Sequence, residues 1–142
     1  MAKRIGILGG MTAESTVSYY LHIVRTWQRE HGNHAYPEIA IDSLSFQPME
    51  DWMEAGEWDQ VAGALEAGLT RLGRAGADFA VIATNTMHLL FDRLQRASDA
   101  LAELGETIGF VKEIRRAGRI GLLKIILRLI AGVEDEGDGS GR

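Results

Sequence analysis

The chain has 142 residues, enough for one domain with a real core. Hydrophobic residues make up 46% and charged residues 25%, as in ordinary globular proteins, and the absence of cysteine excludes disulfides, thiolate nucleophiles and Cys-ligated metals. The net charge of -5 and the lack of a long apolar run argue against nucleic acid and membrane as partners, so we expect a cytoplasmic protein.

The first third of the chain predicts a strand, a helix and a second strand. Residues 3–8 read as a buried strand that ends at Gly9-Gly10, and residues 39–44 as another strand. Between them, Thr12 or Ser15 can cap a helix that the segment "EHGNHAYPE" ends. The apolar residues with helical spacing in this helix are Val17, Leu21, Val24 and Trp27.

The middle of the chain repeats the alternation. A second helical stripe closes at Gly73 and Gly76, residues 79–83 predict a third strand, and a third helix follows. The stripes consist of Trp58, Val61, Leu65, Leu69 and Leu72 in the second helix, and of Leu90, Leu94, Ala97 and Leu101 in the third. The alternation predicts an α/β fold, an open and mostly parallel sheet with helices on both faces, Rossmann-like or flavodoxin-like.

The C-terminal part gives a weaker pattern. Residues 108–111 predict a fourth strand, and "RIGLLKIILRLIAG" is either a strand followed by a helix or one interrupted helix. Its apolar residues 120–130 form either an interface or the last core helix. Residues 112–128 are basic, and we interpret them as a helix face that is solvated or docked on acidic surface. We predict a single domain over 1–132 and a disordered acidic tail over 133–142.

Three loops are expected at the carboxyl ends of the strands, where open parallel sheets bind ligands. They span residues 9–12, 43–47 and 84–88, and two of them are dense in hydroxyls, amides and free backbone N–H groups. Such groups bind a carboxylate or a phosphate at helix N-termini.

Each loop also has a purely structural interpretation. Gly9-Gly10 can be a tight turn, and it lacks the spacing of a dinucleotide fingerprint or of a Walker loop. Residues 84–86 can simply cap a helix, and His88 can be a core or capping histidine. The remaining histidines, which we expect at the surface because they lack metal-ligand spacing, are His22, His31 and His34.

Three separated motifs resemble the N-terminal half of the aspartate/glutamate racemase family, whose members racemise amino acids without pyridoxal phosphate. The motifs are "IGILGGMTAESTVSYY", "AGEWDQVA" and "AGADFAVIATNTMH". The resemblance covers about residues 3–100 and fades after about 105. It implies two similar α/β halves with the substrate in the cleft between them, and one catalytic residue from each half on opposite faces of the substrate Cα.

The resemblance also assigns roles to residues. Thr84 stands where relatives usually have a catalytic cysteine, although some relatives carry threonine there. An alcohol is a poor base, so it needs a relay, and His88 is the nearest candidate. Substrate-binding residues are expected in the first loop and after the third strand: Gly10, Met11, Thr12, Asn85 and Thr86. We expect no cofactor and no metal.

Two departures from the family bear on activity. Met53 stands where many relatives have a glutamine that contacts substrate, and the second catalytic cysteine, with its G-C-T-E-like motif, is absent. "EIRRAGRIGLL" resembles the start of the second half. The sequence thus predicts a racemase-family protein for a small acidic amino acid that is incomplete as a lone chain. The alternative is an inactive half-racemase that serves as a binding or self-associating domain, and a homodimer with two Thr84 loops across one cleft is a further hypothesis.

Overall fold

The computed structural model describes residues 3–32, 34–84, 86–103 and 109–110. Its four strands form one parallel sheet in the order β2-β1-β3-β4. The strands are β1 (Ile5–Gly9), β2 (Ile39–Ser43), β3 (Phe79–Ile82) and β4 (Gly109–Phe110). The predicted α/β fold with a parallel sheet is confirmed.

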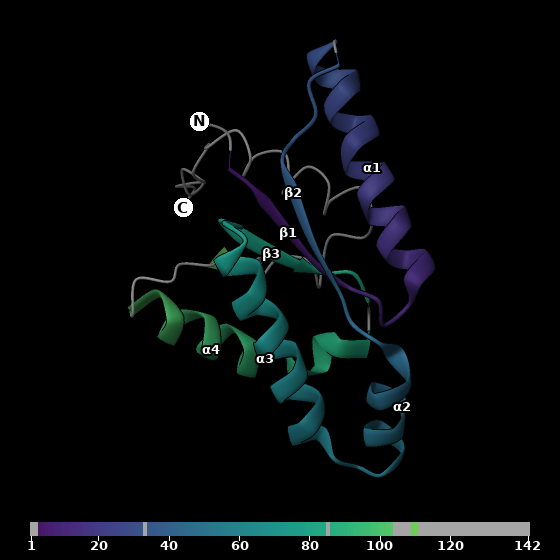
Figure 1. Cartoon of the computed structure of the whole chain (residues 1–142), viewed down its shortest axis with the longest axis vertical. Coiled ribbons are helices and arrows are strands. Elements are labelled where there is room, and N and C mark those ends of the chain that lie inside the picture. Colours follow the sequence, from purple (N-terminus) through teal and green to yellow (C-terminus); the bar gives the residue numbers. More distant parts are fainter. Residues whose placement is uncertain (1–2, 33, 85, 104–108, 111–142) are drawn as a thin grey trace, which may run out of the picture.

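Helices cover both faces of this sheet, as the alternation predicted. Figure 1 shows α1 on one side of the sheet and α3 and α4 on the other, while α2 lies beyond the carboxyl ends of the strands. The helices are α1 (Ala13–His31), α2 (Phe46–Glu54), α3 (Trp58–Arg74) and α4 (Phe91–Glu103), and the short 3-10 helix η1 (Thr86–Leu90) precedes α4. Among the described residues, none of these helices is long and apolar enough to span a membrane.

Strand β1 is buried along its whole length and supplies both layers of the core. Because side chains alternate along a strand, Ile5 and Ile7 face α1, whereas Leu8 faces α3. The layer under α1 consists of Ile5, Ile7, Ile23, Trp27, Phe79, Val81 and Ala83. The larger layer under α3 includes Leu65, Leu69, Leu72, Ile82 and Leu94. Each fully buried aliphatic side chain stabilises the fold by about 1.5–3 kcal/mol, so α1 and α3 are held mainly by these layers.

Helix α1 buries a different face from the one that its apolar residues suggested. Val17 is 57% exposed and Leu21 37% exposed, whereas Thr16 and Ile23 are buried. The reason lies at the start of the helix, where the side chain of Thr16 occupies the space over Gly9 that a β-carbon would otherwise fill. This contact fixes the rotation of α1 and leaves an apolar stripe on its outer side.

Two further segments differ from the sequence-based prediction. Helix α2 was not predicted, because Pro48 and the acidic residues around it hid the spacing of Met49, Trp52 and Met53 that packs on the α3 layer. Proline is tolerated in the first turn of a helix, where its missing N–H has no intrahelical partner anyway. The fourth strand is described only at Gly109 and Phe110, and the predictions for residues 111–142 lie outside the described residues.

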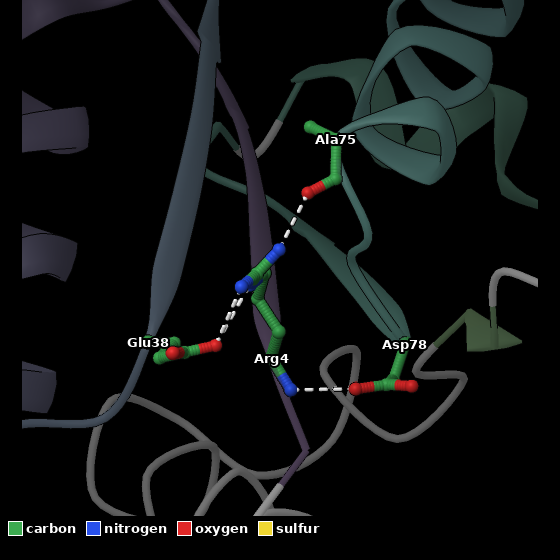
Figure 2. Close-up of polar contacts among 4 residues, drawn as sticks. All are labelled: Arg4, Glu38, Ala75 and Asp78. Atoms are coloured by element: carbon green, nitrogen blue, oxygen red, sulfur yellow. Dashed lines mark hydrogen bonds and ion pairs between the residues drawn. The ribbon is translucent and has the colours of Figure 1, made fainter.

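The amino edge of the sheet is held by a cluster of polar contacts around Arg4 (Figure 2). The guanidinium of Arg4 donates to Glu38 at 2.7 and 3.0 Å and to the carbonyl oxygen of Ala75 at 2.9 Å. Its backbone N–H donates to Asp78 at 2.6 Å. Arg4, directly before β1, thereby connects the segment that leads into β2 with the turn between α3 and β3.

Candidate functional site at the carboxyl edge of the sheet

The loops that follow β1, β2 and β3 meet at the carboxyl edge of the sheet, because all the strands run in the same direction. Two hydrogen bonds prolong the strand pairing into these loops. The N–H of Leu44 donates to Gly9 at 2.9 Å, and the N–H of Ala83 donates to Leu8 at 2.9 Å. The first residues after the strands therefore lie side by side, with the β1 loop in the middle.

The glycine pair after β1 is required by packing. Gly10 has a φ of +85°, and a β-carbon there would lie 2.1 Å from the carbonyl oxygen of Leu44. A β-carbon on Gly9 would lie 2.3 Å from the hydroxyl oxygen of Thr16. The structural interpretation of the pair thus accounts for both glycines: they let the end of β2 and the first turn of α1 approach the end of β1.

The residues predicted to bind substrate in this loop are not equally available to a ligand. The N–H of Gly10 already donates to the hydroxyl of Thr16 at 2.9 Å, and the side chain of Met11 is 2% exposed in the core under α3. Thr12 is exposed and occupies the N-cap position of α1 without a side-chain capping bond, and its hydroxyl donates to the carbonyl oxygen of Met11 at 2.8 Å. The N–H groups of the first turn of a helix have no intrahelical partner. These N–H groups are consequently the donors that the β1 loop offers at its surface.

The loop after β3 places Thr84 directly beyond the most buried part of the sheet. Ala83 is 1% exposed, Thr84 is half-buried, and Thr86 is exposed at the start of η1. Met87 is 1% exposed and anchors η1 in the core, whereas Leu89 is 70% exposed. The hydroxyl of Thr84 therefore sits on a rigid support at the boundary between core and solvent.

Two predicted residues of this loop cannot be placed at the site. Asn85 lies outside the described residues. His88 belongs to η1 by its backbone, and its side chain is not described. Their predicted roles, a substrate-carboxylate donor and a proton relay, remain predictions.

The loop after β2 contributes two hydroxyls that the sequence-based site did not include. Ser43 ends β2 opposite Gly9, and Ser45 stands at the N-cap of α2 without a side-chain capping bond. Both are exposed. Their position at the end of a strand next to the glycine turn is the signal that identifies them, because neighbouring parallel strands bring their ends together.

Asp42 and Arg93, two charged residues near this edge, are paired with residues of α3. The carboxylate of Asp42, one residue before the end of β2, accepts bonds of 3.1 and 2.9 Å from Arg71 of α3. Arg93 of α4 pairs with Glu66 and Asp59 of α3, and these hydrogen bonds raise the pKa of its guanidinium. Within the described part of the chain, no group of three or more His, Asp or Glu residues is arranged to hold a metal ion. The edge thus offers neutral hydroxyl and N–H donors, which suit an anionic group such as a carboxylate.

A family model for Asp/Glu/hydantoin racemases matches residues 8–119, a range that contains all three loops. The chain belongs to this racemase family. Its fold is similar to the crystal structure of a candidate Asp/Glu racemase from Yersinia pestis, with 30% sequence identity and a TM-score of 0.65. That match covers 72% of this chain and 50% of the other, so the chain spans about half the length of this relative.

A second solved structure gives the same family. An aspartate racemase homologue from Pyrococcus horikoshii OT3 is similar at 26% identity with a TM-score of 0.57, over 92% of this chain and 72% of that chain. The family predicted from the three sequence motifs is therefore confirmed. Met53 stands where the resemblance to the family leads us to expect glutamine. It is half-buried and packs against the core under α3.

Proposed function

We propose that the carboxyl edge of the sheet binds the α-carboxylate of a small acidic amino acid, and that Thr84 takes part in proton transfer at its Cα without a cofactor. The position of Thr84 carries the proposal. Thr84 lies half-buried just after β3, next to the start of η1, in a chain of the racemase family. A carboxylate held by the exposed hydroxyls and N–H groups of the three loops would bring Cα close to this residue.

The carboxylate donors have a second role in this proposal. Removal of the Cα proton moves negative charge onto the carboxylate, and donors already oriented toward it stabilise that charge. The backbone N–H groups of the first turn of α1 and the exposed Thr86 at the start of η1 supply such donors. Ser43 and Ser45 extend the set on the β2 side.

Thr84 needs assistance to move a proton, since an alcohol is a far weaker acid than a thiol. In the proposal a water or His88 accepts the proton that Thr84 relays. Inversion requires a second group on the opposite face of Cα, because a single group returns the proton to the side from which it came. The chain contains no cysteine for that purpose. We therefore expect the chain alone to exchange the Cα proton faster than it inverts the centre.

Exchange in deuterated water tests this proposal. The purified chain is incubated with L- and D-aspartate and with L- and D-glutamate, and NMR follows the loss of the Cα proton while chiral chromatography follows the other enantiomer. Exchange with little inversion is the expected result. Inversion at the rate of exchange would show that a second acid/base group acts within this chain or its oligomer, and the absence of both would exclude catalysis by the chain alone.

Thr84→Cys sharpens the test. A thiol has a pKa of about 8.5, so a few per cent of it is ionised near neutral pH, whereas the threonine hydroxyl is not ionised there. Exchange should therefore become faster and rise with pH as the thiol ionises. Exchange that is unchanged by Thr84→Cys would place the proton transfer on another residue.

A second candidate function, a binding domain without catalysis, is favoured by Thr84, because its hydroxyl is a far weaker acid than the thiol that relatives usually have there. Isothermal titration with the same amino acids separates it from the first. Binding without exchange supports this second function, and exchange supports the first.

A further inference from the structure

Strand β2 is the outermost strand on one side of the sheet, and within the described residues no strand pairs with its outer side. On its inner side β2 pairs with β1. The backbone hydrogen bonds at the two ends of this pairing show which way the N–H and C=O groups of β2 point. The N–H of Ile5 donates to Glu38, and the N–H of Leu44 donates to Gly9. Because backbone groups alternate in direction along a strand, residues 38, 40, 42 and 44 face β1. The N–H and C=O groups of Ile39, Ile41 and Ser43 consequently point to the free edge.

This edge lacks the features that usually prevent strands from pairing. Exposed edges are commonly blocked by lysine, proline or a bulge, and β2 has none of these within Ile39–Ser43. Asp42 is its only charged residue, and its carboxylate is turned toward α3 by Arg71. Ile41, on the opposite face, is 44% exposed.

Helix α1 carries a second exposed apolar surface. Val17, Leu21, Val24 and Gln28 follow one another at helical spacing along one stripe of α1. At the end of this stripe the side chain of Gln28 donates to Tyr36 at 3.1 Å, in the segment that leads into β2. Val17, Leu21 and Tyr36 are exposed, and α1 lies on the same face of the sheet as Ile41.

We propose that β2 pairs in antiparallel fashion with β2 of a second copy of this chain, on a two-fold axis through Ile41. In this register Ile41 lies opposite Ile41, and Ile39 lies opposite Ser43 of the second copy. These are the residues whose N–H and C=O groups point outward, so each of these pairs exchanges two backbone hydrogen bonds. The two-fold axis keeps both α1 helices on the same face of the extended sheet.

The charges of β2 are compatible with this register. Asp42 lies opposite Ala40 of the second copy, so no like charges face each other directly across the interface. The two Asp42 carboxylates are diagonal neighbours, and each is already paired with its own Arg71, at 2.9 Å. The register that satisfies the outward backbone groups is therefore also electrostatically acceptable.

This dimer is distinct from a dimer that shares one cleft between two Thr84 loops. Antiparallel pairing turns the carboxyl edges of the two sheets in opposite directions, so each Thr84 stays in a separate site. The inference does not depend on the proposed racemase chemistry, and it leaves that site accessible in both copies.

Sedimentation velocity of the full chain tests the dimer, from about 1 µM to about 100 µM. The wild-type chain should form a dimer, and Ile41→Lys should weaken its association at least tenfold, because two ammonium groups then meet at the axis. Leu89→Lys is the control. Leu89 is 70% exposed in η1, away from β2, and its substitution should not affect association. A wild-type chain that is monomeric over the whole range would overturn the proposal, as would an Ile41→Lys chain that dimerises like wild type.

A cysteine cross-link tests the register itself and does not depend on how well the lysine variant folds. The chain has no cysteine, so Ile41→Cys creates a single thiol. Facing residues in a hydrogen-bonded antiparallel pair lie about 5.5 Å apart at Cα, within the range of a disulfide. Mild oxidation should convert most of this variant to a covalent dimer, and should leave Leu89→Cys largely monomeric. Equal or faster cross-linking at Leu89 would overturn the β2 dimer and would favour association through the carboxyl edges.

Discussion

The two edges of the sheet are built from the same strands but differ in how their polar groups are used. At the amino edge, Arg4 satisfies Glu38, Ala75 and Asp78 within the protein (Figure 2). At the carboxyl edge, Ser45 stands at the start of α2 without a side-chain capping bond, and Ser43 at the end of β2 is exposed. The comparison teaches that a polar cluster near a strand end indicates a ligand site only where its donors are left for a partner. The amino edge stabilises the fold, and the carboxyl edge is available for binding.

The largest effect that would test this contrast is on catalysis at the carboxyl edge. Thr84→Ala removes the proposed proton relay and should lower Cα exchange by about 10²- to 10⁴-fold, the usual contribution of a general acid or base. Thr70→Ala is the matched control, because the hydroxyl of Thr70 only donates to Glu66 within α3. The two variants are compared by NMR in deuterated water. Equal exchange rates would remove Thr84 from the mechanism.

The next effect is on the packing of the carboxyl edge. Gly10→Ala adds a β-carbon against Leu44 at a φ of +85°, and should lower the free energy of unfolding by about 3 kcal/mol. Gly56→Ala is the matched control. Its φ is +73°, but no atom lies within 4 Å of an added β-carbon, so only the backbone strain of about 1 kcal/mol is expected. Urea denaturation measures both values, and similar losses in the two variants would contradict the close packing at Gly10.

A smaller effect is expected at the amino edge. Arg4→Ala removes the bonds to Glu38 and Ala75, and should lower the free energy of unfolding by about 1 kcal/mol, because these groups are largely exposed to solvent. Arg25→Ala, an exposed position in α1, is the control and should change it little. Cα exchange should stay at the wild-type rate in both. If Arg4→Ala reduced exchange while the fold stayed intact, the amino edge would not be purely structural.

The smallest effect concerns salt. The Arg4–Glu38 pair is exposed, so raising the ionic strength from about 0.1 to about 1 M should weaken it by a few tenths of a kcal/mol. A double-mutant cycle with Arg4→Ala and Glu38→Ala, measured at both salt concentrations, isolates this change. A coupling energy that does not depend on salt would contradict this prediction. The hydrogen bond from Arg4 to the uncharged carbonyl oxygen of Ala75 would then be the main contact at this edge.

The hydrophobic pattern of the sequence correctly predicted the elements whose buried residues recur at regular spacing. The all-apolar run of β1 and the stripe of Val61, Leu65 and Leu69 in α3 appear in the structure as predicted. The apolar stripe predicted for α1 is buried only in part, since Trp27 lies in the core but Val17 and Leu21 are exposed. Periodicity gives the existence of a helix, but its rotation depends on what lies beneath it. Here the contact between Thr16 and Gly9 sets that rotation.

The candidate site shows the same division. The position of Thr84 after a buried strand, and the family of the chain, followed from the sequence. The roles of the first loop did not, because burial of Met11 and the bond from Gly10 to Thr16 are decided by contacts between β1 and α1. The loop with Ser43 and Ser45 was expected at the carboxyl ends of the strands, but its place beside the glycine turn follows from the pairing of β2 with β1.

Residue type and spacing along the chain were enough to predict the alternation of β1, α1, β2, α3, β3 and α4, the racemase motifs and the absence of cysteine. Which polar groups remain available followed only from contacts in space. Whether a donor is satisfied depends on its neighbours, as the engaged Arg4 and the uncapped Ser45 show. The position of β2 as the outermost strand among the described residues is likewise a property of the assembled sheet, since strand order is set by long-range pairing.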